Sequence, residues 1–190
     1  MNKFDQLSKE NEQLKLAVNE LSVLNDIATS ISTTESIDTI IDKIVFKCVQ
    51  HLKTEEGTIS LLDEEDDEQK FRTFIRKVDM TQERLPIQLD EQITGWMLKY
   101  KQPLLSNNLM EDARFSFPDY LQMGLNSMLS APLIVKGNLI GYIALFNKKY
   151  ENNFDEKDQR LLAIIASQSG QLIERSRLYE EEKELLLMKE

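Results

Sequence analysis

The sequence is poor in cysteine, histidine, proline and glycine, and each shortage excludes something. With a single cysteine, Cys48, the chain cannot form an internal disulfide, which fits a cytoplasmic location. The single histidine, His51, lies on the same helical segment, but two ligands are too few for a zinc site. Cys48 belongs to an apolar stripe, so we expect it in the core. Four prolines and six glycines leave little room for disordered linkers.

Long apolar runs and an excess of positive charge are also missing. No run approaches the roughly 18 apolar residues that a membrane-spanning helix needs. The first residues lack the apolar core of a signal peptide. Acidic residues number 33 against 23 lysines and arginines, which gives a net charge of −10. Because such a chain repels phosphate backbones, we expect no direct contact with nucleic acid, and none with a membrane.

Residues 3–29 have the heptad pattern of a two-stranded coiled coil. Six of the eight seam positions are apolar and two are asparagine: Phe4, Leu7, Asn11, Leu14, Val18, Leu21, Asn25 and Ala28. Leucine at one seam position and asparagine at the other favour a parallel dimer in fixed register. The alternative is an amphipathic helix that packs on its own domain. We therefore treat residues 1–30 as a separate helix that supports a homodimer.

Residues 31–173 are expected to form one α+β domain around an antiparallel sheet. A capping-box pattern at Ser32-Thr-Thr-Glu35 precedes apolar residues at helical spacing from Ile37 to Leu52. The expected strands are 57–62, 71–78, 85–89 and 104–106, and a short helix covers 91–100. Two further strands within 127–147 flank a turn at Lys136-Gly137-Asn138.

A final helix is expected over residues 155–188. Its first half has an apolar face, and beyond residue 174 it becomes rich in glutamate. A periodic helix of more than about 25 residues without a stop signal is typical of a coiled coil that continues. We expect 174–190 to be a linker helix that leads to an effector domain and contributes to the dimer. A frayed helix at a natural terminus is the alternative.

Several short motifs, taken in their order along the chain, resemble those of a GAF domain, a small-molecule sensor fold of signalling proteins. They are Ile93-Thr-Gly-Trp96, Lys101-Gln-Pro103, Asp112-Ala-Arg-Phe115, Ser127-Met-Leu-Ser-Ala-Pro132, Gly141-Tyr-Ile-Ala-Leu145, and Phe154 with Asp158 and Leu161. The resemblance implies a GAF/PAS-like sheet of about six strands with helices on one face. It also implies a ligand pocket on the other face, beneath residues 91–126.

Aromatic residues and an arginine in that segment are candidate ligand contacts. The candidates are Trp96, Arg114, Phe115, Phe117 and Tyr120, to which the matched strands add Ala131 and Asn147. Stacking faces and a guanidinium suit a flat or anionic ligand, whose identity stays unknown at this point. In the alternative, the aromatic side chains fill the core and Arg114 pairs with Asp112 or Glu111.

A dispersed signature resembles that of a cyclic-nucleotide-binding subset of the family. Asn147-Lys148 is followed by Phe154 and Asp158, but Gln159 stands where that subset has glutamate. Cyclic nucleotide binding is one interpretation. In the other, Lys148 and Asp158 form a structural ion pair, and Asp158 suits the first turn of a helix.

No catalytic arrangement stands out in the sequence. There is no serine–histidine–acid order and no phosphate-binding glycine loop. Family members that bind a bilin or reduce methionine sulfoxide use cysteines for these functions, and the resemblance implies that this chain lacks the cysteines required. The acidic run 63–68 lacks the glycine and ligand spacing of a calcium loop, so we expect a hairpin tip. The sequence predicts a dimeric regulatory sensor that is not an enzyme, or alternatively a ligand-free dimerisation and spacer module.

Overall fold

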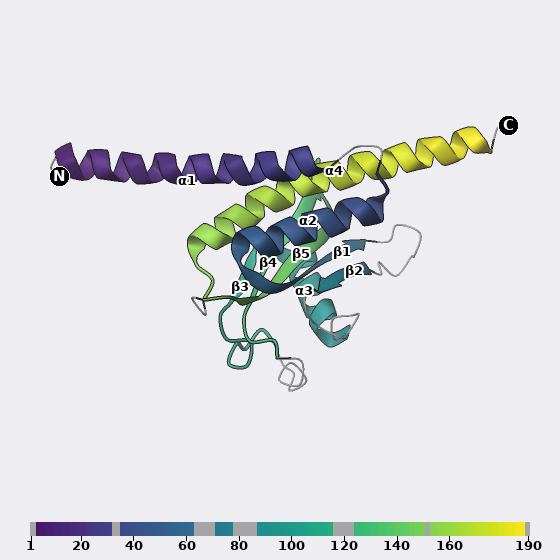
Figure 1. The fold of residues 1–190 in the computed structure, drawn as a ribbon. Helices are drawn as coiled ribbons and strands as arrows, with labels where there is room; N and C mark the ends of the chain where they lie inside the picture. Colours follow the sequence, from purple (N-terminus) through teal and green to yellow (C-terminus); the bar gives the residue numbers. More distant parts are fainter. Residues whose placement is uncertain are drawn as a thin grey trace.

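The computed structural model describes residues 3–31, 35–62, 71–77, 87–115, 124–150 and 153–188. Four helices and five strands lie in these ranges: α1 (Lys3–Ser30), α2 (Ile37–Leu52), β1 (Thr54–Leu62), β2 (Phe71–Lys77), α3 (Ile87–Tyr100), β3 (Leu104–Ser106), β4 (Met128–Val135), β5 (Asn138–Lys148) and α4 (Glu156–Leu187). Figure 1 shows α1, α2 and α4 on one side of the sheet and α3 on the other.

The sheet is antiparallel, and its strand order is β2-β1-β5-β4-β3. The expected α+β class is confirmed, although the described residues supply five strands rather than about six. The central strand β5 shows why both faces are covered. Ile143 and Leu145 belong to the core beneath the helices, whereas Tyr142 and Phe146 belong to the core beneath α3. This alternation is the period of two that a strand imposes on its side chains.

The helical layer is built by apolar stripes on α2 and α4. Seven residues of α2 are buried at helical spacing, as the sequence predicts: Ile40, Ile41, Ile44, Val45, Cys48, Val49 and Leu52. The helix passes so close to β1 that a Cβ added at Gly57 would lie 2.9 Å from Val49 Cγ2. A side chain at this position would require the side chains of Val49 on α2 and Leu145 on β5 to move.

Two short segments differ from the sequence predictions. The strand expected over 85–89 is wrong at its described end, because α3 begins at Ile87. Leu89 is spaced four and eight residues from Ile93 and Met97, and all three are buried on one helical stripe. The helix that was expected to start at Ser32 begins later in the structure, at Ile37. Ser36 caps α2 by accepting a hydrogen bond from the Thr39 amide at 3.4 Å.

The predicted hairpin and the two long helices are confirmed. β4 and β5 pair through Val135 and Asn138, and the turn residues Lys136 and Gly137 have φ of 50° and 85°. Such φ values at both central residues are typical of a two-residue hairpin turn. In Figure 1, α1 and α4 run past the domain toward opposite sides, so the two chain ends lie far apart.

Candidate functional site

Three of the predicted ligand contacts lie together beside α3. The guanidinium carbon of Arg114 is 5.4 Å from the ring centroid of Trp96 and 5.9 Å from that of Phe115. Trp96 comes from α3, and the other two follow β3. The indole Nε1 of Trp96 donates a hydrogen bond to the Gln102 carbonyl at 3.2 Å. The structure thus brings together three of the candidate ligand contacts, with the Arg114 cation within 6 Å of both ring centroids.

Arg114 is also held firmly by its own segment. Its Nε donates to Asp112 Oδ1 at 2.8 Å, and its Nη2 donates to Asp112 Oδ2 at 2.5 Å and to the Leu105 carbonyl at 2.7 Å. The hydrogen bond from the guanidinium lowers the pKa of Asp112 to about 2. Within the described part of the chain, the Nη1 group has no acceptor, and the side chain is 40% exposed. One edge of the guanidinium can therefore still bind an anion.

A buried polar group lies beneath α3, and the sequence analysis missed it. The Tyr142 hydroxyl donates to Asp90 Oδ1, and Ser60 Oγ donates to the same oxygen at 3.1 Å. Burial raises the pKa of Tyr142 well above its ordinary value. The hydroxyl of a buried tyrosine needs a hydrogen-bond partner. A tyrosine within an apolar strand was therefore the sequence signal that could have revealed this group. This link fixes the start of α3 to the central strand.

Ser130 on β4 adds a further buried hydroxyl on the same face of the sheet as Tyr142 and Ser60. It is fully buried, and its register partners are Leu104 on β3 and Ala144 on β5. No hydrogen-bond partner for Ser130 Oγ is found among the described residues. Buried hydroxyls are nearly always paired with protein, water or ligand, so this oxygen marks a position in the layer where a polar group could be bound.

The remaining predicted contacts do not join this cluster. Ala131 is buried on the opposite face of β4, beneath the helices, because it shares the parity of its register partner Ile143. Asn147 is occupied structurally: its Oδ1 accepts from the Asn126 amide at 2.8 Å, and its Nδ2 donates to the Gly124 carbonyl at 2.8 Å. Phe117 and Tyr120 lie outside the described residues.

The ion pair expected from Lys148 and Asp158 is present. Lys148 Nζ lies 2.6 Å from Asp158 Oδ1, and the two side chains are only 8% and 15% exposed. Asp158 also completes a capping box with Asp155, whose side chain accepts from the Asp158 amide. These residues of the cyclic-nucleotide signature therefore join the end of β5 to the start of α4.

A family model of the GAF domain matches residues 34–174. The chain belongs to the GAF domain family. The search of curated proteins found no match to this chain. GAF domains are regulatory rather than catalytic, and in this one the buried Cys48 thiol has its pKa raised to about 12 by desolvation, which leaves it unreactive.

Solved GAF structures share the fold at low identity. The GAF domain of an Acinetobacter phosphoenolpyruvate-protein phosphotransferase is 20% identical, with a TM-score of 0.68 over 85% of this chain and 97% of that one. The corresponding domain from Coxiella burnetii is 15% identical, with a TM-score of 0.70 over 87% and 98%. A methyl-accepting chemotaxis protein, residues 122 to 287, is 17% identical, with a TM-score of 0.62 over 83% and 98%.

Two further searches of the described residues bear on the kind of site. Among those residues, no group of three or more histidine, cysteine, aspartate or glutamate side chains could hold a metal ion. None of the helices found there is both long and apolar enough to span a membrane. The candidate site is the cluster of Trp96, Arg114 and Phe115, which lies in the same layer as the buried Tyr142.

Proposed function

We propose that this GAF domain is a dimeric regulatory sensor, in which a small anionic or aromatic molecule beside Trp96 and Arg114 changes the packing of α1 and α4 across the dimer. The observation that carries the proposal is the unused seam of α1. The buried residues of this helix are Val23 and Ile27, whereas five large apolar side chains at seam positions are exposed: Phe4, Leu7, Leu14, Val18 and Leu21.

The sequence leaves open whether α1 forms a coiled coil or packs on its own domain, and two different faces of the helix bear on these alternatives. Val23 and Ile27 are 3% and 1% exposed, and they pack into the core of the domain. Neither occupies a seam position of the heptad pattern. By contrast, the seam residue Leu14 is 66% exposed. The helix thus packs on its own domain with one face and keeps the coiled-coil face for a partner, which favours a second copy in parallel register.

The far end of α4 offers a second exposed apolar stripe. Leu178 and Leu185, one heptad apart, are 54% and 59% exposed, and Met188 is 80% exposed. A dimer that pairs α1 would bring two copies of α4 onto the same axis. Exposed leucines at heptad spacing support continued pairing along that axis.

A contiguous route of contacts connects the candidate site to these helices. Asp90 at the start of α3 binds Tyr142 on β5. The next residue on that strand, Ile143, faces the opposite way into the core formed with α2 and α4. A ligand that moves α3 would therefore press on the helical layer through one strand. The response is allosteric only if the ligand binds two helix arrangements with different affinity.

The Nη1 edge of Arg114 and the Ser130 hydroxyl, for which the described residues supply no hydrogen-bond partner, support a ligand on this face. A ligand-free spacer is the second candidate, and the pairing of Arg114 with Asp112 and the burial of Phe115 favour it. Native mass spectrometry of the freshly purified chain separates the two. A dimer with additional noncovalent mass supports the sensor, whereas a dimer that gains no mass across a ligand panel leaves the spacer.

A matched pair of variants tests the dimer itself. Leu14→Glu places a charge on the seam, and Gln13→Glu adds the same charge one residue away, off the seam. We expect Leu14→Glu to give a folded monomer in light scattering at micromolar concentration, with Gln13→Glu still dimeric. A monomeric parent chain, or a Leu14→Glu variant that stays dimeric, would overturn the coiled-coil proposal.

A further inference from the structure

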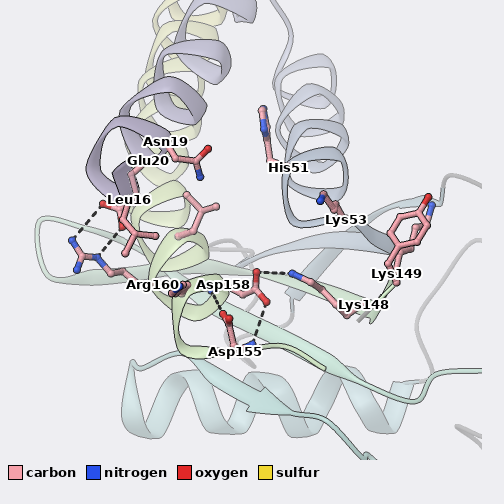
Figure 2. A pocket seen from close by; sticks show the side chains of 13 residues that line it. Leu16, Asn19, Glu20, His51, Lys53, Lys148, Lys149, Asp155, Asp158 and Arg160 are labelled. Carbon is pink, nitrogen blue, oxygen red and sulfur yellow. Dashed lines mark hydrogen bonds and ion pairs between the residues drawn. The ribbon is translucent and has the colours of Figure 1, made fainter. Parts of the chain in front are cut away.

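A basic cleft lies on the other side of the sheet from the candidate site. Its volume is about 270 Å³, and its walls come from α1, the end of α2, the end of β5 and the start of α4 (Figure 2). The α1 residues that line it, Leu16, Asn19 and Glu20, are not seam positions. The cleft therefore stays open in a dimer that pairs through the seam.

The charge of the cleft is opposite to that of the whole chain. Five lysine and arginine side chains and three carboxylates line it, within a protein of net charge −10. Two of the carboxylates are neutralised locally: Asp158 by Lys148 at 2.6 Å, and Glu20 by Arg160 at 2.9 Å. The third, Asp155, accepts a hydrogen bond from the backbone as a helix cap. The cleft thus keeps an excess of positive charge.

Three lysines supply that excess: Lys53, Lys149 and Lys157. None of them forms an ion pair with any residue that the structure describes. Two of them are adjacent in the fold, because the Lys149 amide donates to the Lys53 carbonyl at 2.7 Å. Figure 2 shows Lys53 and Lys149 on one side of the cleft, opposite Arg160. An anion in the cleft would offset the positive charge of these ammonium groups.

Lys53 has an uncommon backbone conformation. Lys53 is the C-cap of α2 with φ and ψ both at 53°, in the left-handed region. That position strongly favours glycine, because a Cβ is strained there. Tyr150, at the edge of the same cleft, has φ of 67°. The same region is occupied by Lys101, Lys136 and Asn147 elsewhere in the described chain, so the lysine side chain in the cleft, rather than its φ value, carries the argument.

We propose that this cleft binds a small molecule carrying two or more negative charges, with a phosphate group as the recognised chemistry. Ammonium groups bind phosphate as point charges, so lysines lining the cleft do not need the fixed geometry of a guanidinium fork. Leu16 and Leu161 give the cleft apolar walls that suit an organic substituent. A bound anion would join the end of α2 and the residues after β5 to the start of α4. The site is separate from the one beside Trp96, so either can exist without the other.

The test is a calorimetric titration of the full chain with pyrophosphate at low salt, repeated with adenosine monophosphate and with orthophosphate. We expect one site per chain, and weaker binding as salt is added. Lys53→Gly and Lys149→Ala should each raise the dissociation constant about tenfold, the worth of one hydrogen bond to a charged group. Lys53→Gly also relieves the backbone, so its melting temperature should not fall.

Lys136→Gly is the matched control. It removes the same charge at the same kind of position, with φ of 50°, but lies at the other end of β5. Ten steps along that strand separate the two ends by about 33 Å. Its affinity for pyrophosphate should equal that of the parent. Equal weakening by the control, or no saturable binding at millimolar pyrophosphate, would overturn the proposal.

Three further outcomes are informative. Stronger binding of adenosine monophosphate than of orthophosphate would identify an organic phosphate, and the reverse order would identify the free ion; both support the site. The Leu14→Glu variant should bind pyrophosphate as the parent does, because every wall of the cleft comes from one chain. Loss of binding in that variant would contradict the single-chain site, whereas failure of the dimer alone leaves it intact.

Discussion

The buried ion pair between Lys148 and Asp158 should contribute far more to stability than the exposed pair between Arg160 and Glu20. Removing one member of a buried pair leaves an uncompensated charge, which costs about 3–5 kcal/mol. Asp158 keeps one backbone donor, the Asp155 amide at 3.1 Å, so the cost should fall toward the lower limit. We expect Lys148→Met to lower the free energy of unfolding by about 3 kcal/mol.

A double-mutant cycle isolates the interaction from the packing of the two side chains. The variants are Lys148→Met, Asp158→Asn and their combination, compared by urea unfolding at one fixed protein concentration because a dimer's stability depends on it. We expect the double variant to lose about 1.5–3 kcal/mol less than the sum of the single variants. The slope of the unfolding curve should stay unchanged.

The same cycle on Arg160→Met and Glu20→Gln is the control. Arg160 is 68% exposed, and its nitrogen and the carboxylate oxygen are 2.9 Å apart, so distance alone does not separate the two pairs. An exposed pair is worth at most about 1 kcal/mol. A coupling energy at Lys148 and Asp158 as small as that of the exposed pair would refute the reasoning that burial sets the magnitude.

Two further predictions concern a glycine and an acid. Gly141→Ala should lower the free energy of unfolding by about 3 kcal/mol or more, because its Cβ would overlap the Ser60 backbone carbonyl oxygen. Gly95→Ala, whose Cβ would have nothing within 4 Å, is the neutral or stabilising control. Equal effects of the two substitutions in urea unfolding would contradict this prediction. Since the pKa of Asp112 is lowered to about 2, its stabilisation is complete above the unfolded value of about 4 and is lost as pH falls toward 2. Carbon-detected NMR titration should show the pKa of Asp112 returning toward 4 in Arg114→Gln, and an unchanged pKa would be the contrary result.

The long elements could be predicted from the sequence because their signals are local. The period of α2, the Asp155 cap of α4 and the Lys136-Gly137 turn each determine structure within a few residues. The strand expected over 85–89 failed because three apolar residues in alternation also fit the start of a helix. The longer stripe that includes Ile93 and Met97 shows which period applies.

The site was predicted in part. Sequence motifs indicated candidate residues, but they did not indicate on which face of the sheet each residue lies. Arg114 and Trp96 meet as expected, but Ala131 was assigned to the wrong side of β4 relative to them. The local sequence does not determine which of the two sets of alternating side chains on a strand faces the helices. The link from Asp90 to Tyr142 and the basic cleft both depend on residues more than 50 positions apart, which only the folded chain brings together.

The way α4 is attached determines what kind of motion it can transmit. Its first turn is fixed to the sheet by the buried pair of Lys148 and Asp158, and to α1 by Arg160 and Glu20. Its middle is packed through Ile165 and Ile173, whereas Leu185 is exposed. A helix held at one end and along its middle cannot bend easily, so a shift at the sheet moves it as a rigid lever. We therefore expect an effect at either binding site to be largest at the free end of α4, where the exposed leucines of two chains would separate or pair.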